Sequence, residues 1–137
     1  AVVAHSFGAV VTFAAFQHGG PGRVALVAPA VKGAWFLDVF RAQVGLSDKA
    51  YERLRSRFEA FAGPYLMRVL AGEGDVPDAR ILILHDPEDD RTPYADSAEY
   101  AERRPDTKLV DVVGAGHKRI LSQARTDVAL VEFLPEC

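Results

Sequence analysis

The residues that decide the fold are Ala1-Val2-Val3-Ala4-His5-Ser6-Phe7-Gly8, an apolar run that leads directly into a serine. Small residues at Ala4 and Gly8 allow a strand and the helix that follows it to approach closely around a sharp turn. Such a turn lifts the serine hydroxyl out of the sheet and places the backbone N–H of Phe7 where it can stabilise an oxyanion. We therefore interpret Ser6 as a candidate nucleophile at the end of a strand.

Four apolar runs predict strands, and the stretches between them predict helices. The runs are Ala1–Ala4, Val24–Ala28, Arg80–His85 and Lys108–Val113. Their apolarity is continuous rather than alternating, which is typical of strands buried on both faces of a parallel sheet. We therefore expect an α/β fold in which helices flank a parallel sheet.

Three helices are predicted close to these strands: Phe7–Gln17, Pro93–Arg104 and Thr126–Leu134. Thr92 is the expected N-cap of the second of them, with Pro93 in the first helical position. Proline fits that position because its missing N–H would have no partner inside the helix.

The connection over residues 31–79 is much longer than one crossover helix needs. Within it, Ser47 predicts an N-cap for a helix with apolar positions at 3–4 residue spacing, and Gly63-Pro64 predicts its end. We expect a small helical cap inserted between two strands. Aromatic residues of this segment, Trp35 among them, are candidates for a pocket beneath the cap, although plain packing is the commoner use of such residues.

Two polar turns follow the third and fourth strands. His85-Asp86-Pro87-Glu88-Asp89-Asp90-Arg91-Thr92-Pro93 is acidic, and Gly114-Ala115-Gly116-His117 is rich in glycine. A serine needs a base to take its proton, a histidine can be that base, and a carboxylate can orient the histidine. Each turn alone is a common surface feature. Together with Ser6 they stand in the order Ser–Asp–His at strand ends, where open α/β sheets build their sites.

These motifs resemble the C-terminal half of the α/β-hydrolase fold family, over essentially the whole chain. The family's Gly-His-Ser-x-Gly is matched by Ala4–Gly8 with alanine for the first glycine, and its Gly-x-Gly-His by Gly114–His117. Its pattern His-Gly-x-x-Asp-x-x-Val-Pro aligns with His85–Pro93, with Asp86 in place of glycine and Thr92 in place of valine. The resemblance therefore implies Asp89 as the acid, with Asp90 as the alternative.

The resemblance implies a serine hydrolase that cleaves an ester or a related acyl substrate through an acyl-enzyme. Ser6 would attack the carbonyl, His117 would transfer the proton, and Asp89 would hold His117 in its productive tautomer. We expect no metal and no organic cofactor, and a small-molecule acyl substrate as the partner. The alternative is a protein of the same fold that binds a small ligand without turning it over. The resemblance leaves the substrate's acyl and leaving groups open.

Two further residues are weighed for the pocket. His5 precedes the nucleophile, where its ring would either line the pocket or pack against neighbours, and packing is the favoured role. For Trp35, packing between cap and sheet is also the favoured role. The alternative is contact with the substrate, in which case Trp35→Ala would change selection among esters of different chain length.

Composition narrows the class of protein. The chain has 137 residues, a net charge of −3 and no basic cluster, so nucleic acid is not an expected partner. The only cysteine is Cys137, which excludes an internal disulfide or a zinc cluster and fits a reducing compartment such as the cytoplasm. No run is long enough to predict a membrane span. The oligomeric state stays open.

The resemblance also implies that residues 1–137 are the C-terminal part of one domain. The family's other oxyanion N–H comes from a loop that this stretch does not contain. We therefore expect these residues by themselves to be nearly inactive.

Overall fold

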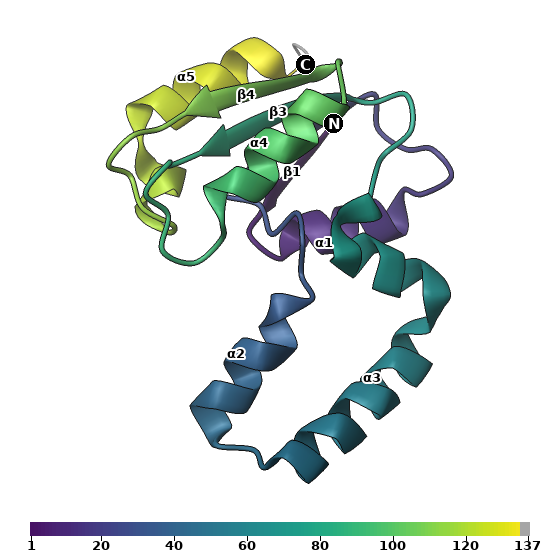
Figure 1. Cartoon of the computed structure of the whole chain (residues 1–137). Helices are drawn as coiled ribbons and strands as arrows, with labels where there is room; N and C mark the ends of the chain where they lie inside the picture. The colour runs from purple at the N-terminus through teal and green to yellow at the C-terminus, as the bar shows by residue number, and fades with distance from the viewer. Residues whose placement is uncertain (135–137) are drawn as a thin grey trace.

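The centre of the fold is a sheet of four parallel strands in a computed structural model that describes residues 1–134. The strands are β1 (Val2–His5), β2 (Arg23–Val27), β3 (Arg80–His85) and β4 (Thr107–Asp111), and they lie side by side in chain order (Figure 1). The four predicted strands are thus confirmed, β3 with the predicted bounds. Because all strands are parallel, the segments that follow β1, β3 and β4 emerge at the same edge of the sheet. Cys137 lies outside the described residues.

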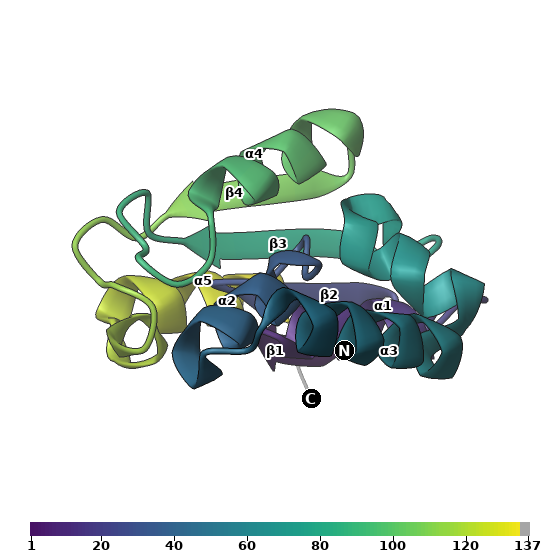
Figure 2. The ribbon, with the colours of Figure 1, turned by 60° about the horizontal axis from the view of Figure 1, so that its bottom comes forward.

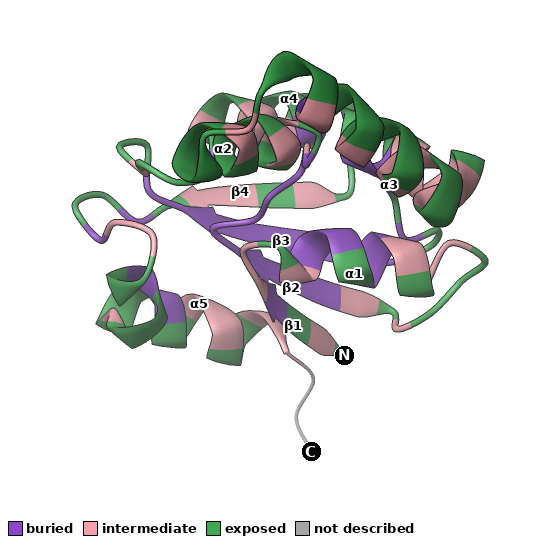
Figure 3. Ribbon diagram, turned by 90° about the horizontal axis from the view of Figure 1, so that it is seen from below, coloured by how far each residue is buried: buried purple, intermediate pink, exposed green. Residues whose placement is uncertain are grey.

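Helices cover both faces of the sheet. Helices α1 (Gly8–Ala15) and α4 (Tyr94–Arg103) pack through Phe13 and Tyr100 on one face, and α5 (Ala124–Phe133) packs through Leu130 on the other. Figure 3 shows α5 on the opposite side of the sheet from α1 and α4. A short 3-10 helix, η2 (Arg119–Ser122), precedes α5. The predicted α/β architecture is confirmed.

Burial differs between the inner and outer strands. In β2 the run Val24–Val27 is fully buried, and in β3 so is Ile81–His85, as expected for strands covered on both faces. The same expectation is wrong for β1 and β4. Val3 in β1 is 49% exposed, and Lys108 in β4 is also exposed. The reason is position, since β1 and β4 form the two edges of the described sheet.

Residues 31–79 form a helical insertion between β2 and β3, which contains α2 (Trp35–Val44), α3 (Asp48–Arg68) and η1 (Val69–Glu73). Figure 1 shows α2 and α3 extending away from the sheet and converging at the turn that joins them, and Figure 2 shows both helices in front of β1 and β2. Ser47 caps α3 as predicted, accepting a hydrogen bond from the Ala50 N–H at 3.4 Å. Gly63 interrupts the helix with a φ of 71°, at the predicted break.

Within residues 1–134, no helix combines the length and the apolarity that crossing a bilayer requires.

Candidate active site

Ser6 stands on a strained turn between β1 and α1. Its φ is 55°, a left-handed backbone conformation that residues with side chains rarely adopt. The turn is fixed on both sides of the serine, because the Ser6 N–H donates to Val27 O at 3.0 Å and Ser6 O accepts from the Ala30 N–H at 3.0 Å. A Cβ on Gly8 would lie 3.4 Å from the Cβ of Ala4, so a small residue suits this position. The predicted strand–turn–helix is present.

The structure brings Ser6, His117 and Asp89 into one hydrogen-bonded chain. Nε2 of His117 lies 2.9 Å from Ser6 Oγ, and Nδ1 lies 2.8 Å from Asp89 Oδ2. A carboxylate only accepts hydrogen bonds, so the imidazole proton belongs on Nδ1 and the free lone pair of Nε2 faces the serine hydroxyl. The side chains of His117 and Asp89 are 11% and 1% exposed. This is the arrangement in which a histidine can take a proton from a serine.

Asp89 is surrounded by hydrogen-bond donors. Its Oδ1 accepts from the N–H groups of Arg91 and Thr92, at 2.7 and 3.1 Å. Burial raises the pKa of Asp89, but the hydrogen bonds from His117 and from these N–H groups outweigh it and hold the pKa below its usual value. Asp90, the alternative acid, has a side chain that is 79% exposed and lies 3.7 Å from Arg91. The structure therefore places Asp89, and not Asp90, beside His117.

Two polar residues close to Asp89, Thr92 and His85, were not assigned to the site from the sequence. Thr92 Oγ1 lies 3.0 Å from Asp89 Oδ2 and 3.3 Å from His117 Nδ1. The expectation that Thr92 caps a helix is wrong: Pro93 is the N-cap of α4, and the Thr92 hydroxyl is buried in the site instead. His85 is fully buried, with Nδ1 2.7 Å from Ser97 Oγ and Nε2 3.3 Å from Asp89 Oδ2. Burial lowers the pKa of His85, which favours its neutral form.

His5 and Trp35 occupy different places. Nε2 of His5 lies 2.9 Å from the carbonyl oxygen of His117, and the two rings are 4.9 Å apart, so His5 packs against His117 as favoured from sequence. Trp35 lines a cavity of about 320 Å³ together with Ser6 and Arg91. Its indole N–H donates to Lys32 O at 2.6 Å, which fixes the ring.

Phe7 offers two groups to this cavity. Its backbone N–H stands at the N-cap of α1 and has no hydrogen-bond partner within residues 1–134, so it is available to an oxyanion. The residue as a whole is 43% exposed, and its ring lies 5.8 Å from the ring of Phe36.

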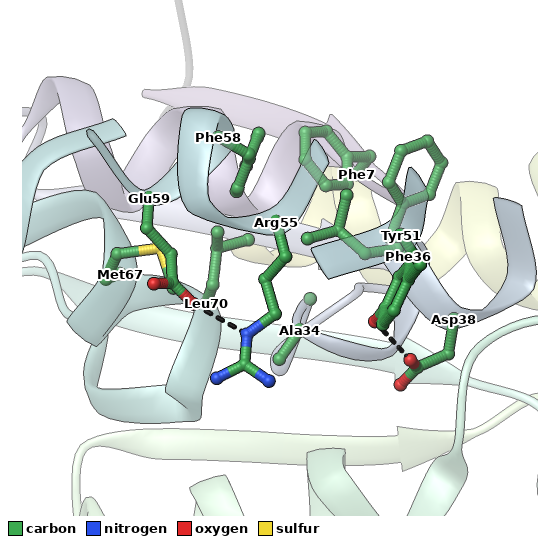
Figure 4. A pocket seen from close by; sticks show the side chains of 12 residues that line it. Phe7, Ala34, Phe36, Asp38, Tyr51, Arg55, Phe58, Glu59, Met67 and Leu70 are labelled. Atoms are coloured by element: carbon green, nitrogen blue, oxygen red, sulfur yellow. Dashed lines mark hydrogen bonds and ion pairs between the residues drawn. The ribbon is translucent and has the colours of Figure 1, made fainter. Parts of the chain in front are cut away.

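A larger cavity of about 530 Å³ lies under the helical insertion (Figure 4). Phe7 and Phe36 line both cavities, so the two are neighbours across this aromatic pair. Most of its remaining lining is apolar, and the polar groups there are paired, Tyr51 with Asp38 and Arg55 with Glu59. The lining residues are Phe7, Gly33, Ala34, Phe36, Leu37, Asp38, Tyr51, Arg55, Phe58, Glu59, Met67 and Leu70.

In the described part of the chain, no group of three or more His, Cys, Asp or Glu side chains is arranged to hold a metal ion.

Solved structures similar to this chain share one fold. No family model and no curated protein sequence matches it. A protein described as a candidate non-heme bromoperoxidase from Mycobacterium tuberculosis H37Rv is 15% identical, with a TM-score of 0.61 over 97% of this chain and 66% of its own. A carboxylesterase structure from the thaumarchaeon Nitrososphaera gargenis is 17% identical, with a TM-score of 0.59 over 96% and 62%. A meta-cleavage product hydrolase from Pseudomonas fluorescens IP01 is 20% identical, with a TM-score of 0.54 over 96% and 62%.

The chain thus has the α/β-hydrolase fold in part, as the motifs predicted. It spans slightly less than two thirds of the length of the structures that it matches.

Proposed function

We propose that this protein is a serine hydrolase that cleaves an ester or a related acyl substrate. The observation that carries the proposal is the continuous chain of hydrogen bonds from Ser6 Oγ through His117 to Asp89. The fold is the one found in an esterase and in other hydrolases among the similar structures, which agrees with this chemistry.

In this mechanism Ser6 Oγ attacks the substrate carbonyl while Nε2 of His117 takes its proton. Asp89 stabilises the imidazolium that forms, because its carboxylate faces Nδ1 at 2.8 Å. The Phe7 N–H donates to the oxyanion of the tetrahedral intermediate. His117 returns the proton to the leaving group, and a water activated by the same histidine then releases the acid from Ser6.

The two cavities suggest the kind of substrate. The smaller one contains Ser6 and would hold the reacting carbonyl. The larger one lies on the other side of Phe36 from Ser6, and its volume is in the range of small-molecule sites. We infer that one side of the scissile bond carries an apolar group that extends past Phe36 into this cavity.

The experiment is covalent labelling of the full-length protein with a fluorophosphonate probe, followed by mass spectrometry to locate the adduct. We expect the adduct on Ser6, and we expect labelling to become much slower in His117→Ala because the base is lost. His18→Ala is the matched control, since His18 is an exposed histidine away from the site, and it should label as the unaltered protein does. A well-folded protein that takes up no probe would overturn the proposal in favour of ligand binding without turnover.

A further inference from the structure

A second buried carboxylate beside the triad takes no part in the proton transfers. Asp86 directly follows β3 and is 1% exposed. It lies at the start of the acid loop, residues 86–92, which carries Asp89. The neighbouring histidine loop, residues 112–117, carries His117 and follows β4. A carboxylate this deeply buried requires partners that compensate for its lost hydration.

The partners of Asp86 are backbone N–H groups from both loops. Its Oδ2 accepts from the Gly116 N–H at 2.5 Å, and its Oδ1 accepts from the Gly114 N–H at 3.3 Å. Within its own loop, Oδ1 also accepts from the Glu88 N–H at 3.1 Å. One side chain therefore bridges the acid loop and the histidine loop.

The backbone of the histidine loop is shaped to receive this carboxylate. Gly114 and Gly116 have φ angles of 74° and 64°, the left-handed region that favours glycine. Backbone in this region can turn nearby N–H groups toward a common point and form an anion site. Here the N–H groups of Gly114 and Gly116 face Asp86, whereas the Ala115 N–H between them donates to Val112 O at 3.3 Å. The glycines of Gly-Ala-Gly-His thus serve the anion of Asp86 in addition to presenting His117.

We propose that Asp86 is a positioning residue whose carboxylate joins the two loops and thereby holds the imidazole of His117 between Ser6 and Asp89. Gly116 directly precedes His117, so the bond to its N–H fixes the peptide unit from which the histidine side chain projects. The inference rests on the proposed function, because it concerns the geometry of the same triad.

The bridge depends on the ionised form of Asp86. A carboxylate oxygen can accept the Gly116 N–H, whereas an amide nitrogen in its place would oppose one donor with another. The hydrogen bond from Gly116 contributes most to a pKa of Asp86 below its usual value, so the group is ionised at neutral pH.

The test uses the full-length protein and compares Asp86→Asn, which keeps the shape and removes the charge, with Asp86→Gly, which removes the side chain. The matched control is Asp90→Asn, the same chemical change in the same loop on a side chain that is 79% exposed. For a short-chain ester we expect kcat per titrated Ser6 to fall about 10- to 100-fold in both Asp86 variants with KM nearly unchanged, because a small displacement of a catalytic group has effects of this size. Asp90→Asn should match the unaltered protein.

A readout that does not need turnover accompanies the kinetics. Amide hydrogen exchange at Gly116 and His117 should become faster in Asp86→Asn and Asp86→Gly than in Asp90→Asn, well below the unfolding temperature of each. If Asp86→Gly does not fold, Asp86→Asn decides alone. Unchanged kcat, or unchanged exchange at Gly116, in a folded Asp86 variant would overturn the inference.

The two proposals fail in different ways. If the unaltered protein takes no fluorophosphonate on Ser6, the proposed function fails, and exchange at Gly116 then decides whether Asp86 joins the loops. If the unaltered protein is labelled and active and the Asp86 variants keep its kcat, the proposed function stands and the positioning role fails.

Discussion

The loops at the carboxyl edge of the sheet and the helical insertion are held in place in contrasting ways. Asp86 and the side chain of Asp89 are each 1% exposed, and both accept hydrogen bonds from backbone N–H groups. In the insertion, α2 has no buried residue at all. An ion pair between Arg41 and Asp48, both exposed, joins it to the start of α3. Figure 3 shows α2 and α3 largely in green and pink, the colours of exposed and partly buried residues.

Under the proposed function, this difference would separate the residues that react with the substrate from the residues that select it. Leaving a buried polar group without its partner costs about 1–3 kcal/mol, whereas an exposed ion pair contributes about 0–1 kcal/mol. The loops therefore hold Ser6, Asp89 and His117 in one geometry, whereas an exposed lining residue of the insertion such as Phe36 can change at little cost in stability. In an enzyme, the groups that react need to be held rigidly. The residues that surround the substrate can be more adaptable.

The largest expected effect on activity comes from a substitution of Asp89 in the acid loop. In Asp89→Asn, the amide nitrogen would face Nδ1 of His117 and favour the wrong tautomer. We expect kcat/KM to fall by about 10³- to 10⁴-fold for a p-nitrophenyl ester, as for other triads that lose this carboxylate. Asp90→Asn should stay close to the unaltered protein. The reverse result would make Asp90 the orienting acid and would contradict the observed geometry.

A second test concerns the stability of the protein rather than its reaction rate, and it substitutes the buried residue His85. His85→Asn keeps a polar atom near Nδ1 but leaves the groups around Nε2 without a partner. We expect it to lower the free energy of unfolding by about 1–3 kcal/mol at pH 7.5, measured by urea unfolding. Ser122→Ala, a change at an exposed serine outside the site, serves as the control.

The pH dependence of that loss has a definite sign. Burial lowers the pKa of His85 in the folded protein, so below about pH 6.5 the unfolded chain binds a proton that the folded one does not. Stability from neutral His85 is thus present above that pH and is lost as the pH falls through the folded pKa. The gap between the unaltered protein and His85→Asn should narrow from pH 7.5 to pH 5. A gap that widens on acidification would show that His85 is charged when folded.

The sequence predicted the sheet and the meeting of the triad for a simple physical reason. Apolar runs mark strands, and Ser6, Asp89 and His117 each follow the carboxyl end of a parallel strand, so topology brings them to one edge. The bridge made by Asp86 could not be predicted in this way. Its partners on the histidine loop are backbone N–H groups 28 and 30 residues away. Nearly every residue has a backbone N–H, so the types of side chain in a sequence do not show which N–H groups will bind a carboxylate.

The insertion shows a second limit. Phe58 and Phe61 both fit the apolar spacing of α3, yet Phe58 packs against the core and Phe61 is 88% exposed. Spacing identifies an apolar stripe but not the point at which the stripe leaves the core. Thr92 illustrates the same limit in the loops. Its position in the sequence suggests a local helix cap, whereas its hydroxyl lies 3.3 Å from Nδ1 of His117, a residue on the other loop.

A substitution of Phe36 tests whether the insertion selects the substrate. Phe36 is 49% exposed and lines both cavities, so Phe36→Ala should leave stability almost unchanged and widen the passage between them. We expect the preferred acyl or alcohol chain to lengthen, with a change of about tenfold in relative kcat/KM across a series of p-nitrophenyl esters. Phe61→Ala, an exposed phenylalanine that lines neither cavity, is the control. An unchanged chain-length profile in Phe36→Ala would remove the larger cavity from the substrate path.

The smallest expected effect lies at the start of α3. Ser47→Ala removes the N-cap acceptor of the Ala50 N–H and should lower the free energy of unfolding by about 0.5–1 kcal/mol. The control is Ser56→Ala, an exposed serine inside the same helix, where alanine should be neutral or slightly stabilising because of its helix propensity. Since no hydrogen bond or ion pair among the described residues joins α3 to Ser6, Asp89 or His117, kcat for a short acetate ester should be unaffected in both variants. A loss of kcat in Ser47→Ala would mean that the order of α3 reaches the triad, and chemistry and selection would then be coupled rather than separate.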